Sequence, residues 1–148
     1  MDLRKTFPRS MRVKLEGYVH LGRMIDKCRA VLAGTEGEYI YPCPMDERLM
    51  HFAGITADQF TAAVRANLTD EGVAAWFRQT ATPHEPDELE AWNQQLLQRG
   101  PSSTESMERF KKYRDSVDPS RTDLTAWSDL QDLEEGRTVP RRPTTTPT

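Results

Sequence analysis

The sequence has little cysteine and no long hydrophobic run, and these two shortages exclude several classes of protein. Only two of its 148 residues are cysteine, too few for a small domain held together by several disulfides. No stretch approaches the roughly 18 apolar residues that span a bilayer. The basic residues near the start precede no apolar run of the kind that a secretory signal contains. We therefore predict a soluble cytoplasmic protein with no membrane partner.

The motifs of common nucleotide-binding folds and hydrolases are also missing, among them the P-loop, the dinucleotide fingerprint and H-E-x-x-H. Cys28 lies eight residues after His20, and His51 lies eight residues after Cys43. Eight residues of helix span about 12 Å at 1.5 Å per residue, whereas two ligands of one tetrahedral zinc lie within about 4 Å of each other. We therefore predict no metal site and no cofactor.

Charge is unevenly distributed along the chain, although the net charge is only -3. Residues 1–34 contain eight Lys and Arg against three Asp and Glu, and residues 84–136 contain six against thirteen. This asymmetry could favour docking of the two ends on each other or present a basic face to an anion, but solvated helix faces of opposite charge are the preferred explanation. The pI of about 5.6 and the lack of basic residues interleaved with the tryptophans disfavour a nucleic-acid partner.

Apolar residues recur at helical spacing through most of the chain, which predicts an all-α fold of six or seven short helices. The first stripe runs from Tyr18 to Leu32, and Gly34 is suited to end its helix. The one extended segment is expected near residues 38–42. Further helices are predicted from Pro44 to about Ala53, after the capping box Thr56–Gln59, after Thr69 or Asp70, from Asp87 to Arg99, from Ser103 or Thr104 to about Val117, and from Asp123 to Glu135.

The pattern divides the chain into three parts. Residues 1–14 form a basic, irregular N-terminal arm, because Pro8 prevents a regular helix there. Residues 15–136 form a single compact helical domain. Residues 137–148 are rich in Thr and Pro and are predicted to be disordered.

Cys43 is the candidate for chemistry, because it lies between Pro42 and Pro44 at the expected cap of a helix. Helix N–H groups at that position would stabilise a thiolate and lower the thiol pKa. In that hypothesis His20, Asp26 and Tyr39 line a cleft beside the thiol, and Arg48 or His51 folds back towards it. The alternative is that the two prolines fix a turn and the sulfur fills a gap. Cys28 lies on the apolar stripe and is expected to be a small buried hydrophobe.

Four segments resemble the bacterial family catalogued as domain of unknown function 5069: LEGY at 15–18, MIDKCRA at 24–30, GEYIYPCPMD at 37–46 and FAGI at 52–55. The resemblance extends over residues 2–136. It implies a small, mostly helical, cytoplasmic protein, and it assigns no activity and no catalytic residue.

Two functions remain open on the sequence. The absence of a catalytic motif favours a binding or interaction protein that recognises an unknown protein or a small anionic ligand through its basic arm, at Arg4, Lys5, Arg9, Arg12 and Lys14. The alternative is a small enzyme or redox sensor that uses the thiol of Cys43.

Overall fold

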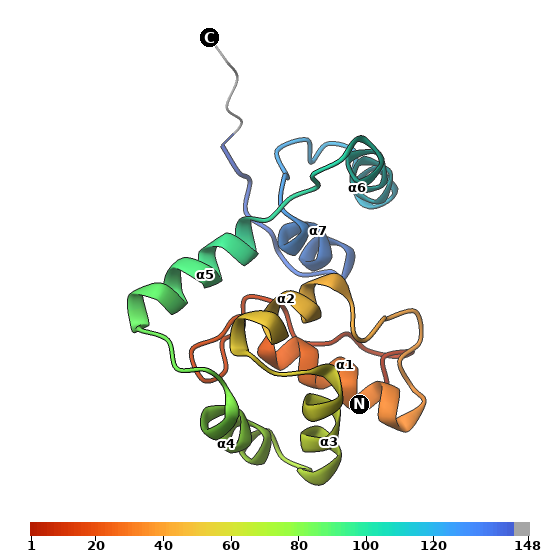
Figure 1. Ribbon diagram of the computed structural model, residues 1–148. Coiled ribbons are helices and arrows are strands. Elements are labelled where there is room, and N and C mark those ends of the chain that lie inside the picture. The colour runs from red at the N-terminus through yellow and green to blue at the C-terminus, as the bar shows by residue number, and fades with distance from the viewer. Residues whose placement is uncertain (144–148) are drawn as a thin grey trace. The chain divides into compact units, whose positions relative to one another are not determined.

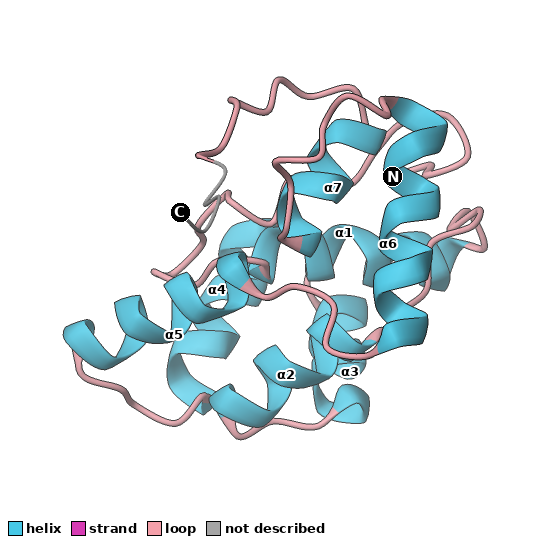
Figure 2. Cartoon of the chain, turned by 90° about the horizontal axis from the view of Figure 1, so that it is seen from above, coloured by secondary structure: helices cyan, strands magenta, loops and turns pink. Residues whose placement is uncertain are grey.

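The computed structural model describes residues 1–143, which form seven helices and no strand (Figures 1 and 2). The predicted all-α fold is confirmed. Among the described residues, no helix is both long and apolar enough to cross a membrane. The helices are α1 (Leu21–Ala33), α2 (Pro44–Ala53), α3 (Ala57–Ala66), α4 (Asp70–Thr80), α5 (Pro86–Gln98), α6 (Thr104–Val117) and α7 (Trp127–Glu134).

The chain divides into two compact units, Met1–Asn93 and Gln94–Thr148, with the boundary inside α5. The sequence pattern contains no sign of this boundary, because α5 runs through it without a break. That residues 15–136 fold as one domain stays a prediction.

Local capping chemistry places most helix ends where the sequence predicts them. Gly34 adopts a left-handed φ of 70° and ends α1, a conformation that glycine reaches without a steric penalty. Thr56 accepts the backbone N–H of Gln59 at 3.1 Å, and the Gln59 side chain accepts the N–H of Thr56 at 2.9 Å. Pro44 is the first residue of α2, where its missing N–H costs no hydrogen bond.

Three predictions need correction. The helix expected from Tyr18 begins only at Leu21, because His20 takes a left-handed φ of 71°. The segment 38–42 is turn and irregular chain and pairs with no strand. The last helix begins at Trp127 and not at Asp123, because the Asp123 carboxylate binds Arg121 at 3.1 Å and is unavailable as a cap.

The first unit packs α1 to α4 around a single hydrophobic core, with α3 lying against both α1 and α4 (Figure 1). Tyr18 stands edge-on to Phe77 with their ring centroids 4.9 Å apart. Residues 1–14 contain no helix, yet Leu3 and Met11 are buried. The buried core comprises Tyr18, Leu21, Met24, Ile25, Cys28, Leu49, Met50, Ala53, Ile55, Phe60, Val64, Val73 and Phe77.

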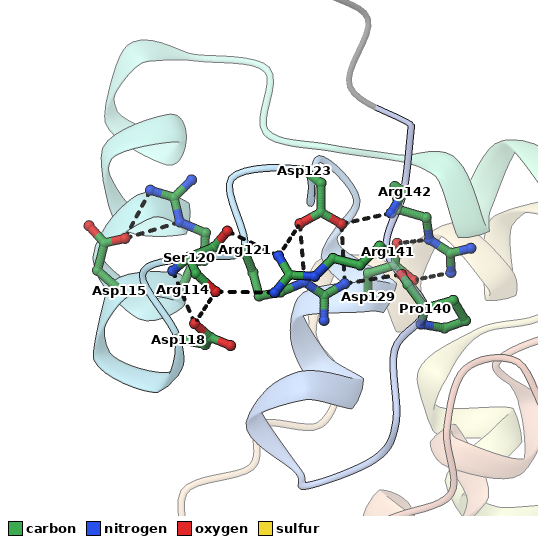
Figure 3. A network of polar contacts seen from close by, with 10 residues as sticks. All are labelled: Arg114, Asp115, Asp118, Ser120, Arg121, Asp123, Asp129, Pro140, Arg141 and Arg142. Atoms are coloured by element: carbon green, nitrogen blue, oxygen red, sulfur yellow. Dashed lines mark hydrogen bonds and ion pairs between the residues drawn. The ribbon is translucent and has the colours of Figure 1, made fainter.

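The second unit combines a small apolar cluster, which includes Phe110 and Val139, with a network of ion pairs (Figure 3). In that network Asp123 accepts from the Arg121 side chain and from the backbone N–H of Arg142 at 2.7 Å. The bond from Arg121 holds the pKa of Asp123 well below its usual range. Within the predicted disordered tail, residues 137–143 lack a helix but contribute Val139 and Arg142 to these contacts. Residues 144–148 of that tail lie outside the described residues.

Candidate functional site

Asp46 lies at the centre of a buried polar group in the first unit, together with His20, Lys27 and Cys43; we call these four residues the Asp46 cluster. Asp46 is fully buried, and its two carboxylate oxygens take different partners. Oδ1 lies 2.6 Å from Nε2 of His20. Oδ2 accepts from Nζ of Lys27 at 2.7 Å and from the backbone N–H of Cys43 at 2.9 Å. The cluster therefore joins the start of α1, its middle and the first turn of α2.

Local sequence positions two of these residues. Cys43 is the N-cap of α2 and Asp46 follows three residues later, at the position where a side chain reaches back to the cap N–H. The ammonium of Lys27 uses all three donors, on Asp46, on the carbonyl of Ile40 at 3.0 Å and on Sγ of Cys43 at 3.1 Å. Every proton of this buried ammonium is therefore satisfied.

The protonation states follow from burial and pairing. Burial alone would raise the pKa of Asp46, but the hydrogen bonds and charges of His20 and Lys27 outweigh it and lower that pKa to about 2. Burial lowers the pKa of His20, so its ring is neutral at pH 7. Because a carboxylate can only accept, Nε2 carries the ring proton and Nδ1 is a buried acceptor without a hydrogen-bond partner in the described chain.

The environment of Cys43 reverses the expected direction of its pKa. The residue is half-buried. Burial is the largest cause that raises the pKa of its thiol, and the Asp46 carboxylate adds to the effect. Lys27 opposes this rise without cancelling it. The helix cap therefore does not activate the resting thiol, because burial, together with the Asp46 carboxylate in the same turn, outweighs it.

The structure unites part of the predicted set. His20 joins Cys43 through Asp46. Asp26 instead binds the side chain of Arg9, at 3.0 Å. The ring of Tyr39 faces the guanidinium of Arg23 at 5.6 Å, and Arg48 and His51 are exposed on α2. Sequence reasoning missed Lys27 and Asp46, although the spacing of Asp46 from the cap was a usable signal.

The sequence spacing argues against a metal site at the pairs His20–Cys28 and Cys43–His51, but folding brings a different set of possible ligands together. Donor atoms of His20, Cys43 and Asp46 all lie within 4.8 Å of one another. The ammonium of Lys27 already contacts two of these three residues. A metal ion would face that positive charge at close range, so the arrangement favours the ammonium as the cation of this site.

A second feature is a surface hollow of about 290 Å³ formed by α1, α3 and the turn after α3; we call it the α1–α3 hollow. Two arginines and a highly exposed leucine give it a mixed basic and apolar lining. No sequence pattern predicted it, since its two sides meet only on folding. The lining residues are Arg29, Leu32, Ala33, Val64, Arg65, Asn67 and Leu68.

The two arginines of the hollow are held differently. Nη1 of Arg29 binds Asp70 at 2.6 Å, and its Nη2 is buried with no hydrogen-bond partner in the described chain. Arg65 is exposed and forms no ion pair with any residue that the structure describes. The hollow therefore offers one fixed and one free guanidinium.

A family model described as a domain of unknown function, DUF5069, matches residues 5–137. A search of curated proteins found no match.

Proposed function

The chain belongs to the DUF5069 family, whose description assigns no activity, and we propose that it is a binding protein for a small anionic ligand. The ligand has a carboxylate next to an apolar portion and occupies the α1–α3 hollow. The observation that carries this proposal is the pairing of an apolar lining with two guanidinium groups in one hollow. We also propose that the protein works in the cytoplasm, since both of its cysteines are free thiols.

Size and charge support a ligand of this kind. A hollow of about 290 Å³ lies at the lower limit of small-molecule sites, which begin near 300 Å³. Guanidinium groups bind carboxylates through paired, charge-assisted hydrogen bonds. Arg65 is free to make such bonds, while Leu32, Val64 and Leu68 supply apolar contact.

Arg29 adds a second reason for an anion. A buried N–H without a partner costs free energy, and a ligand oxygen that displaces the atoms covering it would recover that cost. Its neighbour Asp70 already binds Nη1 and fixes the side chain, so the unpartnered Nη2 is held in place before any ligand arrives. Pre-organised donors of this kind favour binding because less side-chain freedom is lost.

The basic N-terminal arm is a weaker site than its sequence suggested. Arg4 binds Asp2 at 3.0 Å, Arg9 binds Asp26 and Asp70, and Lys14 binds Glu90 at 2.8 Å. Most of the arm's charge is therefore already matched by carboxylates of the same chain. We therefore propose the hollow, and not the arm, as the site of the small anionic ligand.

The test uses the ¹⁵N-labelled full chain, titrated by NMR with octanoate and, in parallel, with octanol. We expect octanoate to shift the amide signals of Leu32, Asn67 and Leu68, and octanol to bind at least tenfold more weakly, since it lacks the charge-assisted bonds. Arg65→Gln should weaken octanoate binding by about tenfold, the loss of one such contact.

The matched control is Arg48→Gln, which removes an exposed arginine of α2 outside the hollow and should leave octanoate binding unchanged. Equal binding of octanol and octanoate, or an octanoate affinity that is unchanged by Arg65→Gln, would show that the hollow does not recognise an anion.

A further inference from the structure

The thiol of Cys43 and the side-chain nitrogen of Lys27 are in direct contact, and the α1–α3 hollow does not involve them. We propose that this pair is a modification site, at which hydrogen peroxide joins Lys27 Nζ to Cys43 Sγ through a single oxygen atom. The resulting N–O–S bridge links α1 covalently to the cap of α2 and is reversed by thiol reductants. The protein would thus respond to oxidants without a second cysteine.

The geometry holds the two atoms ready for this reaction. Sγ and Nζ lie 3.1 Å apart. The side chain of Lys27 is only 4% exposed, and its bonds to Ile40 and Asp46 prevent it from turning away. Cys43 is half-buried, whereas Cys28 is fully buried, so we expect peroxide to reach Cys43 more readily. Cys28 therefore serves as a buried control thiol within the same chain.

The bridge requires two equivalents of peroxide. The thiolate form of Cys43, a minor form because burial raises the pKa of this thiol, attacks one peroxide oxygen. An O–O bond breaks, and Cys43 becomes a sulfenic acid with release of one water. A second peroxide removes two further electrons as the nitrogen–oxygen bond forms, and two more waters are released. Starting from a thiol and an ammonium, the products are the bridge, three waters and one proton. Sulfur and nitrogen are each oxidised by two electrons, and two peroxides are reduced.

The separation of the two atoms favours a bridge over a direct bond. An oxygen atom fits between Sγ and Nζ with little movement of either side chain. A direct sulfur–nitrogen bond would require the atoms to close almost half of the gap, against the two hydrogen bonds that hold Lys27 in place. Cys43 forms no disulfide, and the nitrogen of Lys27 is in direct contact with its sulfur, which makes Lys27 the available partner of an oxidised Cys43.

The bridge would also change the charge of the Asp46 cluster. It removes the ammonium that pairs with the carboxylate of Asp46. His20 then becomes easier to protonate, because the Lys27 charge is one of the causes that lower its pKa. A protonated His20 can take over as the cation beside Asp46, so the buried carboxylate keeps a partner in the oxidised state.

The experiment treats the folded full chain with hydrogen peroxide and measures its intact mass and its tryptic peptides. We expect a gain of one oxygen with a loss of two hydrogens, a cross-linked peptide pair that contains Lys27 and Cys43, and recovery of the original mass with dithiothreitol. Cys28→Ser should behave like the wild type. Cys43→Ser and Lys27→Arg should give no such product.

The wild-type peptide map decides the question even if a variant fails to fold. Oxidation of Cys43 that stops at sulfenic or sulfinic acid without linking the two peptides would overturn the proposal. So would a linked pair that has lost two hydrogens without gaining oxygen, or a product of the expected mass that persists in Lys27→Arg.

Discussion

Lys27 and Asp46 lie on different helices, and their side chains meet at 2.7 Å with 4% and 0% of their surfaces exposed. Burial of a pair of opposite charges is expensive unless each charge has further hydrogen bonds. Here the ammonium has two more acceptors and the carboxylate has two more donors. The pair is therefore fully satisfied, and removing one member leaves the other buried without its counter-charge.

We expect Asp46→Asn to lower the free energy of unfolding by about 3 kcal/mol, the usual cost of breaking a buried pair from one side. Urea denaturation at pH 7 measures this value. The matched control is Glu47→Gln, which neutralises the exposed neighbouring carboxylate in the same helical turn and should cost less than about 1 kcal/mol. Equal losses in the two variants would mean that the buried pair contributes no more to stability than an exposed carboxylate does.

Stability should fall in acid in two stages. The folded pKa of His20 is lowered by burial from 6.5, so the unfolded chain binds its proton first and the His20 contribution is lost as the pH falls below about 6.5. The folded pKa of Asp46 is about 2 against 3.8 unfolded, so its contribution is complete above pH 3.8 and is lost towards pH 2. That second loss amounts to about 2 kcal/mol.

The variant His20→Asn isolates the first stage, since asparagine tolerates the left-handed backbone of this position and does not titrate. The hydrogen bond to the Phe52 carbonyl raises the pKa of His84, so His84 stabilises the folded state as the pH falls, opposite to His20. This effect is the same in the wild type and the variant. Urea midpoints between pH 7.5 and 5 should converge for wild type and variant as the pH falls. A constant difference would show that His20 has an ordinary pKa in the folded state.

Two glycines should respond differently to alanine. A Cβ at Gly100 would lie 2.2 Å from the carbonyl oxygen of Thr125, whereas a Cβ at Gly34 would meet nothing within 4 Å. Gly34→Ala should therefore lower the free energy of unfolding only by the cost of alanine in a left-handed backbone, about 1 kcal/mol. Gly100→Ala forces the backbone to move and should cost at least ~2 kcal/mol. Thermal denaturation of both variants tests the order, and a smaller loss for Gly100→Ala would contradict it.

Features that depend on a few neighbouring residues could be predicted from the sequence. The glycine end of α1, the proline start of α2 and the capping box at Thr56 all follow from backbone chemistry within one turn. The left-handed backbone of His20 has no such local cause, because the surrounding fold imposes it. As a result, α1 is shorter than its apolar pattern predicts.

The candidate site divides in the same way. Cys43 was recognisable because its cap position is local. Its partner Lys27 was not, since sixteen residues separate them and only the packing of α1 against the turn before α2 brings them together. The α1–α3 hollow depends on two helices and so has no counterpart in any short stretch of sequence.

The backbone N–H of Cys43 and the ammonium of Lys27 share one oxygen of Asp46. The same atom therefore completes the first turn of α2 and neutralises a charge on α1. Before α1 has packed, this carboxylate has no buried cation to pair with, and burial of Lys27 would cost free energy that no ion pair offsets. We therefore expect initiation of α2 and burial of the middle of α1 to be coupled during folding, so that the two helices gain protection from hydrogen exchange together.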